Sequence, residues 1–142
     1  MSVVKILVVD DALPWQRFVT TYFETKTEFK ILTVAADGLQ AVQKAHELRP
    51  DVILMDVSLP GMNGFEATRE IRKISPNSKI LFLSALGDSA IVQEAFSAGG
   101  SGYVLKQDSG MDLIPGIRAI LLDQQFVSRS LMGWHGCSNP NA

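Results

Sequence analysis

The sequence is poor in the residues that build disulfide bonds, zinc sites and histidine-dependent catalytic sites. It holds one cysteine, Cys137, so no internal disulfide can form. Its two histidines are His46 and His135, and only the second lies near that cysteine, which leaves too few ligands for a closed zinc site. A histidine-based catalytic triad finds no support either, so the chemistry of this chain has to rest on other side chains.

Long apolar runs and an excess of charge of one sign are missing as well. No run approaches the roughly 20 apolar residues that a membrane-spanning helix needs, and the N-terminal residues 1–5 have no signal-peptide pattern. The formal net charge is −2, from 13 basic and 15 acidic residues, so no basic surface for nucleic acid is indicated. These features predict a cytoplasmic protein that itself binds neither membrane nor nucleic acid.

The residues that are present suffice for one packed domain, since 46% of the 142 residues are apolar and 20% are charged. Strands are expected at residues 3–9, 29–35, 51–55, 79–83 and 103–105, and helices at about residues 14–23, 37–48, 65–74, 89–98 and 111–122. This alternation predicts an α/β fold of the doubly wound, flavodoxin-like type. We expect a five-stranded parallel sheet in the common order 2-1-3-4-5, with five helices on its two faces.

Polar side chains follow four of the predicted strands. Asp10 and Asp11 follow the first strand, Asp56 the third, Ser84 the fourth and Lys106 the fifth. Because ligands of open parallel sheets bind beyond the carboxyl ends of the strands, we expect these groups to converge there. Three neighbouring carboxylates repel one another unless one is protonated or a cation is present, and Mg²⁺ binds carboxylates together with phosphate oxygens. The pattern predicts phosphoryl transfer to an aspartate.

Four motifs together resemble the response-regulator receiver domain, a CheY-like fold, over about residues 3–123. Those motifs are Val8-Val9-Asp10-Asp11, Leu54-Met55-Asp56 with Leu59-Pro60-Gly61-Met62-Asn63-Gly64, Leu83-Ser84-Ala85, and Gly102-Tyr103-Val104-Leu105-Lys106. Each alone is weak evidence. All four in order, at the ends of strands one, three, four and five, are highly specific.

The resemblance implies a role for each residue of the acidic group. Asp56 would be phosphorylated by a partner histidine kinase. Asp11, Asp56 and the backbone carbonyl of Ser58 would bind Mg²⁺ directly, and Asp10 would act largely through a bound water. Lys106 would pair with the phosphoryl group. No enzymatic activity is implied beyond self-phosphorylation and autodephosphorylation.

The resemblance also implies a switch. Ser84 would move to hydrogen-bond a phosphoryl oxygen, and Tyr103 would swing inward as it does so. The readout would be the surface of the fourth helix, fifth strand and fifth helix, where phosphorylation could also promote a homodimer.

Three further observations concern the surroundings of the motifs. Many receivers have a proline after the lysine, in a cis peptide, whereas Gln107 follows Lys106 here, and a cis bond before a non-proline residue costs about 3 kcal/mol. The geometry of that loop is left open. Pro115 lies inside the fifth predicted helix, which is expected to start late or bend. Trp15 is expected one helical turn from Asp11, where its fluorescence would report metal binding.

The sequence divides into a receiver domain at residues 1–123 and a linker and tail at residues 124–142, which we expect to be flexible and to contain no output domain. Details of the fifth strand and helix look closest to NarL-type transcriptional regulators, which usually continue into a helix-turn-helix DNA-binding domain. A transcriptional regulator shortened in this chain and a stand-alone receiver that acts by protein–protein interaction both fit.

Three other kinds of protein fit the sequence less well. Mg²⁺-dependent phosphatases with an aspartyl nucleophile resemble the pattern Asp-x-Asp on the first strand, which Asp10-Asp11-Ala12 lacks. A flavodoxin-like cofactor binder needs a phosphate loop rich in Ser, Thr or Gly, but the loop here is acidic. A receiver that has lost phosphorylation is disfavoured because all the needed residues are present.

Overall fold

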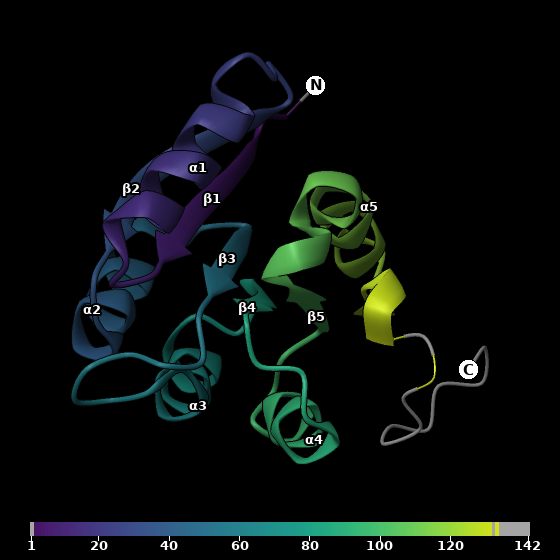
Figure 1. Cartoon of the computed structure of the whole chain (residues 1–142). Helices are drawn as coiled ribbons and strands as arrows, with labels where there is room; N and C mark the ends of the chain where they lie inside the picture. The colour runs from purple at the N-terminus through teal and green to yellow at the C-terminus, as the bar shows by residue number, and fades with distance from the viewer. Residues whose placement is uncertain (1, 132, 134–142) are drawn as a thin grey trace.

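A parallel β-sheet forms the centre of the molecule (Figure 1). The computed structural model describes residues 2–131 and residue 133. The strands are β1 (Val4–Val9), β2 (Phe29–Ala35), β3 (Val52–Met55), β4 (Lys79–Ser84), β5 (Gly102–Leu105) and β6 (Phe126–Val127). Their order is β2-β1-β3-β4-β5-β6, and all pairs are parallel. The predicted order 2-1-3-4-5 is confirmed, while the sixth strand was not predicted.

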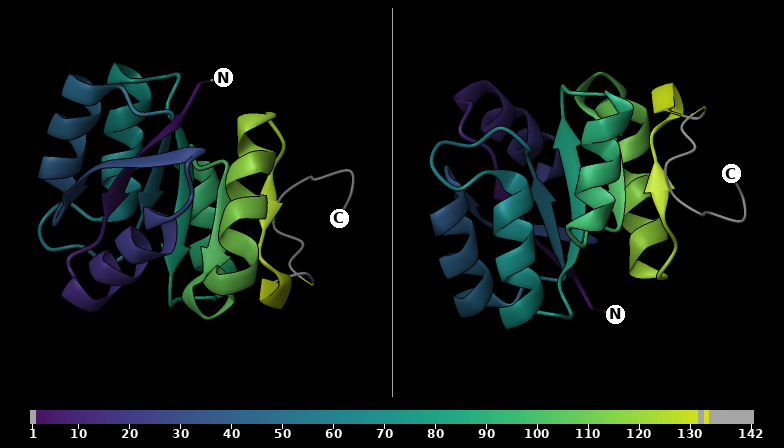
Figure 2. Two further views of the ribbon diagram at one scale, coloured as in Figure 1. Left: turned by 90° about the horizontal axis from the view of Figure 1, so that it is seen from above. Right: turned by 90° about the horizontal axis from the view of Figure 1, so that it is seen from below.

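Helices cover both faces of this sheet (Figure 2). They are α1 (Leu13–Glu24), α2 (Gly38–Leu48), α3 (Gly64–Ile74), α4 (Ser89–Ser97) and α5 (Ser109–Leu121), with 3₁₀ turns η1 (Lys106–Asp108) and η2 (Arg129–Leu131). Apolar side chains of α1 and α5 pack on one face, and those of α2, α3 and α4 pack on the other. No helix within the described residues is long and apolar enough to cross a membrane.

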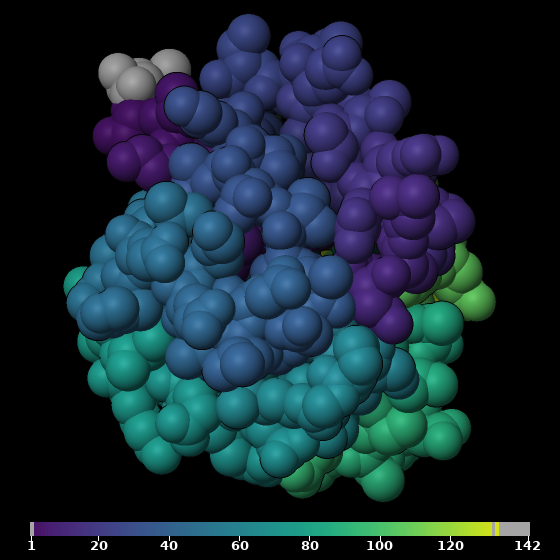
Figure 3. Space-filling model, turned by 90° about the vertical axis from the view of Figure 1, so that its left-hand side faces the viewer, coloured from purple at the N-terminus to yellow at the C-terminus, as the bar shows by residue number. Residues whose placement is uncertain are grey.

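The central strands β1, β3, β4 and β5 are mostly apolar because both of their faces are covered. In β1, Ile6 and Val8 enter the core beneath α1 and α5, whereas Leu7 and Val9 enter the core beneath α2, α3 and α4. Successive side chains of a strand point to opposite faces, so a central strand needs an apolar residue at every position. At the edge of the sheet, β2 is flanked by α1 and α2 (Figure 3), and its residues from Lys30 to Val34 are partly or fully exposed.

The helix that contains Pro115 begins earlier than expected. The sequence predicted a start near Met111 or a bend, but α5 runs without interruption from Ser109 to Leu121. It follows η1 directly, so the chain is already coiled by the 3₁₀ turn where α5 begins. Proline removes one backbone hydrogen bond from a helix interior. Burial of Leu113 and Ile117 against the sheet offsets that loss.

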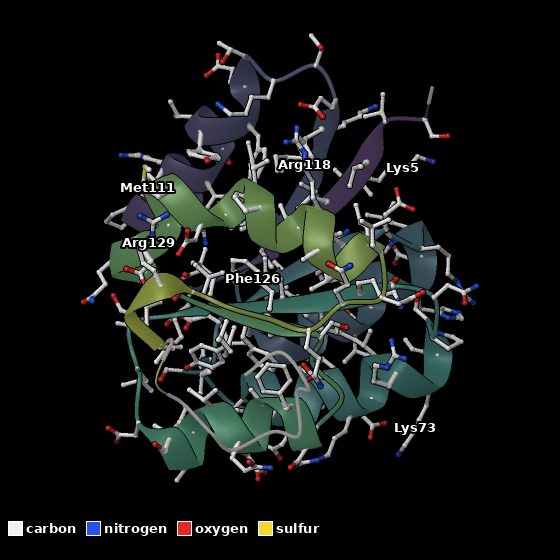
Figure 4. All side chains as sticks on the ribbon, turned by 90° about the vertical axis from the view of Figure 1, so that its right-hand side faces the viewer. Lys5, Lys73, Met111, Arg118, Phe126 and Arg129 are labelled. Atoms are coloured by element: carbon white, nitrogen blue, oxygen red, sulfur yellow. The ribbon has the colours of Figure 1, made fainter. Side chains whose placement is uncertain are left out.

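Residues that the sequence assigned to the linker pack against the domain. Phe126 and Val127 form β6 beside β5, and Ser128 is fully buried. Figure 4 shows this segment passing along α5, with Phe126 beside the helix and Arg129 near its N-terminal end. Residues 132 and 134–142, which hold the rest of the expected flexible tail and His135 and Cys137, lie outside the described residues.

Candidate functional site

Three carboxylates meet at the carboxyl ends of β1 and β3. One oxygen from each of Asp10, Asp11 and Asp56 lies within 4.8 Å of the others. The strands bring them together because Val9 pairs with Met55, and the Asp56 N–H donates to the Val9 carbonyl at 3.0 Å. Asp10 and Asp56 are buried, while Asp11 is exposed. The predicted convergence of the three carboxylates is confirmed.

Lys106 places a positive charge within this group. Its ammonium lies 2.8 Å from Asp10 Oδ2 and 3.4 Å from Asp56 Oδ2, and its side chain is 9% exposed. It arrives from the end of β5, which β4 separates from β3. The ammonium offsets part of the repulsion between the buried carboxylates, so Lys106 acts as a counter-ion within the site.

Burial governs the protonation of Asp56. Removal from water raises the pKa of its carboxyl group, the neighbouring Asp10 charge raises it further, and Lys106 and the Val57 N–H act against both. The net pKa lies above the ordinary value. One carboxylate oxygen, Oδ1, accepts from the Val57 N–H at 2.8 Å, and the other faces Lys106. The Asp56 carboxylate is thus oriented by the backbone N–H of the next residue and by the Lys106 ammonium.

Asp10 connects the start of α1 to the carboxylate site by hydrogen bonds. Its Oδ1 accepts from the Ala12 N–H at 2.8 Å, and its backbone carbonyl accepts from Gln16 Nε2 at 2.6 Å. In the same turn, the face of the Trp15 ring lies 4.9 Å from the Lys106 ammonium, measured to the ring centroid. The sequence predicted Trp15 one helical turn from Asp11, but it gave no sign of this contact with Lys106.

Ser84 and Tyr103 meet at the backbone of Leu86. Ser84 is buried, and its Oγ accepts from the Leu86 N–H at 3.2 Å. The Tyr103 hydroxyl donates to the Leu86 carbonyl at 2.5 Å, and no part of this side chain is exposed. Burial is the main cause that raises the pKa of Tyr103 to about 12, so the phenol remains a hydrogen-bond donor. Tyr103 therefore occupies the inward position in this structure.

The loop after β3 folds back onto Asp56. The Gly64 N–H donates to the Val57 carbonyl at 2.9 Å, and a Cβ on Gly64 would stand 2.1 Å from the Asp56 carbonyl oxygen. Asn63 closes the loop by capping α3, since its side chain accepts from the Glu66 N–H and the Glu66 side chain accepts from the Asn63 N–H. Ser58 lies in this loop and is exposed.

The peptide bond between Lys106 and Gln107 is trans, as are the others within the described residues. The 3₁₀ turn η1 begins at Lys106, and its Asp108 is buried. A turn of this kind needs no proline after the lysine, which settles the loop geometry that the sequence left open.

Comparison with known proteins agrees with this geometry. Residues 6–118 match the family described as the response regulator receiver domain. The chain belongs to this family. The receiver domain is similar to the chemotaxis protein CheY of Thermotoga maritima, with 41% identity over 102 residues that cover 72% of this chain and 84% of CheY. It is also similar to the response regulator protein VraR of Staphylococcus aureus, with 36% identity over 81% of this chain.

A solved response-regulator structure has the same fold. The two-component response regulator of the LuxR family from an Aurantimonas species superposes with a TM-score of 0.88 at 33% identity, covering 94% of this chain and 95% of that chain. The match to VraR covers 55% of that protein, so this chain spans about half the length of that relative. The relatives thus include a regulator of the LuxR family.

The acidic group of this receiver domain suits a hard divalent cation. Asp10, Asp11 and Asp56 form the carboxylate triad that is typical of the receiver Mg²⁺ site. The donors are all oxygens, and the Lys106 ammonium already rests against two of the three side chains. The crevice therefore attracts positive charge and offers the ligand type that Mg²⁺ prefers.

Proposed function

We propose that Asp56 accepts a phosphoryl group from the phosphohistidine of a partner histidine kinase. The observation that carries this proposal is a buried carboxylate beside two others, with a lysine ammonium 3.4 Å away at the end of a parallel sheet. Such a group supplies the positioning and the charge neutralisation that phosphoryl transfer requires.

In the transfer, one Asp56 oxygen forms a bond to phosphorus as the phosphorus–nitrogen bond of the donor breaks. The electron pair of that bond leaves with the imidazole nitrogen, and the product is an acyl phosphate on Asp56. Lys106 stays within reach of the new phosphoryl oxygens and offsets their charge. Asp10, Asp11, Asp56 and the Ser58 carbonyl would hold Mg²⁺, which when bound neutralises further phosphoryl charge.

Ser84 and Tyr103 would carry the signal away from Asp56. The Ser84 hydroxyl can donate to a phosphoryl oxygen once it turns from the Leu86 N–H. Since Tyr103 bonds to the carbonyl of the same Leu86, a shift of that backbone changes both contacts. The surface that responds comprises α4, β5 and α5, and it would serve a homodimer or another partner.

The response is best assigned to transcriptional control through a DNA-binding output outside this chain. This assignment draws on the likeness to the LuxR-family regulator and to VraR. The likeness to CheY supports the alternative of a stand-alone receiver that acts by binding another protein. A phosphatase that uses an aspartyl nucleophile is a weaker candidate, because the residue two places after Asp10 is Ala12.

Acetyl phosphate with Mg²⁺, followed by intact mass measurement, tests the phosphoacceptor. One phosphoryl adduct is expected in the wild-type protein and none in Asp56→Asn. Asp123→Asn serves as the matched control, because this carboxylate is exposed and pairs with Lys79. An adduct of equal yield in Asp56→Asn, or none in the wild-type protein, would refute the proposal.

A further inference from the structure

The Lys106 ammonium is enclosed on three sides. Asp10 and Asp56 contact it at 2.8 and 3.4 Å, and the Trp15 ring covers it at 4.9 Å from the ring centroid. An ammonium over the face of an indole is attracted by the negative charge density of the ring, and this attraction is strongest when water is excluded. With 9% of its side chain exposed, Lys106 meets that condition.

The position of Trp15 is fixed by the same residue that pairs with Lys106. Asp10 holds the first turn of α1 through hydrogen bonds from the Ala12 N–H and from Gln16 Nε2. Trp15 lies within this turn, and its N–H donates to the Ala12 carbonyl at 3.0 Å. On the side chain itself, Phe18 packs edge-on at 5.1 Å between ring centroids. The ring is therefore held in place independently of Lys106.

We propose that Trp15 is a positioning residue, which keeps the Lys106 ammonium directed at Asp56 for phosphoryl transfer. This inference rests on the proposed function of Asp56. A lysine side chain has many rotamers, and a flat apolar ring on its outer side removes those that lead into water. In this role Trp15 acts through Lys106, the charged group over which its ring lies.

Substitution of Trp15 separates the effect of an aromatic ring from that of apolar volume. Phosphorylation of Trp15→Leu by acetyl phosphate at saturating Mg²⁺ is expected to be about five-fold slower than in the wild-type protein, whereas Trp15→Phe retains most of the rate. Should Trp15→Leu fold poorly by circular dichroism, Trp15→Met replaces it, because the longer and unbranched methionine side chain adapts better to an irregular gap. Phe29→Leu, a core aromatic that does not touch Lys106, controls for a general loss of packing.

Two measurements distinguish positioning from a purely structural role. In a Lys106→Ala background, Trp15→Leu is expected to cause no further loss of rate, because the group it acts through is gone. The affinity for Mg²⁺ by titration calorimetry is expected to stay within about two-fold of the wild-type value, since a general loosening of the site would weaken metal binding and phosphorylation together.

Equal rates for Trp15→Leu and the wild-type protein would overturn the inference. So would an equal loss in the presence and absence of Lys106, a Phe variant as slow as the Leu variant, or a large fall in Mg²⁺ affinity. The proposed function fails in a different way, through the absence of any adduct on wild-type Asp56.

Discussion

Gly64 lies so close to the backbone of Asp56 that any side chain there would displace it, because a Cβ would stand 2.1 Å from the Asp56 carbonyl oxygen. We expect Gly64→Ala to lower the free energy of unfolding by about 3 kcal/mol or more, since the two backbone segments have to separate. The loop that presents Asp56 would shift with them, so phosphorylation by acetyl phosphate should fall as well. Urea denaturation measures the first effect.

Gly110→Ala is the matched control for that variant. Gly110 lies in the first turn of α5, and a Cβ there would meet no atom within 4 Å. Alanine is the better helix former by up to about 1 kcal/mol, so this variant should be slightly stabilised or unchanged. Similar losses in the two variants would contradict the role of close approach at Gly64.

Asp56→Asn should stabilise the protein at neutral pH. The pKa of Asp56 is raised in the folded protein, mainly by burial, so the folded state favours the protonated form. Protonated Asp56 therefore stabilises the folded state. This stabilisation is fully present below the ordinary carboxyl pKa and is lost as the pH rises through the raised pKa. At pH 7 the buried charge is unfavourable, and its removal should gain about 1 kcal/mol, or roughly 4 °C in melting temperature.

The gain should shrink as the pH falls toward the ordinary carboxyl pKa, where Asp56 is already protonated. Melting curves of both proteins between neutral and acid pH measure this, with Asp123→Asn as the control for loss of one exposed negative charge. A gain that is the same at every pH would show that another cause is at work.

The segment after α5 should detach when Asp108 is replaced. Both carboxylate oxygens of Asp108 accept hydrogen bonds, from the Ser128 hydroxyl at 2.7 Å and from the Ser130 hydroxyl and N–H at 2.7 and 3.0 Å. Asp108→Ala leaves these donors unpaired, and we expect a loss of about 2 kcal/mol in unfolding free energy. Gln107→Ala removes only an exposed contact to Ser130 and should cost much less.

Lowering the pH should loosen the segment after α5 in the same way as Asp108→Ala. Burial alone would raise the pKa of Asp108, but the hydrogen bonds from Ser128 and Ser130 outweigh it and hold the pKa below its ordinary value. A depressed pKa means that the stabilisation is present above the ordinary carboxyl pKa and is lost as the pH falls through the depressed one. The protection factors of the Ser128 and Leu105 amides, which correct the exchange rate for its intrinsic pH dependence, should fall in acid, and unchanged protection factors would refute the expectation.

Trp15 fluorescence should report cation binding at the carboxylates. Its ring faces Lys106, which shares Asp10 and Asp56 with the proposed Mg²⁺ site, so an arriving dication repels the ammonium beneath the ring. The chain has two tryptophans, so the measurement is made in Trp134→Phe. A saturable change on adding Mg²⁺, absent in Asp11→Asn, is expected; an unchanged spectrum would place the metal elsewhere.

Much of the fold was predictable because its signals are local. The apolar runs of the central strands and the polar residues directly after them are read from neighbouring positions, and parallel topology then brings Asp10, Asp56 and Lys106 together. The contact between Trp15 and Lys106 was not predictable in this way. It depends on the direction in which one ring turns at the start of α1, and core packing explains an aromatic residue in that helix equally well.

The sixth strand escaped prediction for a similar reason. Phe126–Val127 is only two residues long, which is too short for an alternating pattern to appear. It is held by partners distant in the sequence. Arg129 forms an ion pair with Asp112 at 2.9 Å, and the Ser128 hydroxyl donates to Asp108 of η1 at 2.7 Å. Neither aspartate has a sequence signature that marks it as an anchor.

This short strand has a practical consequence for anyone who trims the gene. The family match ends at residue 118, but β6 pairs along the outer side of β5, so the two edges of the sheet among the described strands are β2 and the two-residue β6. A version that stopped before Phe126 would make the longer strand β5 the edge and leave unpaired the Ser101 and Tyr103 carbonyls, which accept from the Phe126 and Ser128 N–H groups. Exposed borders of this kind recruit strands from other molecules, so the shorter protein would be prone to aggregate.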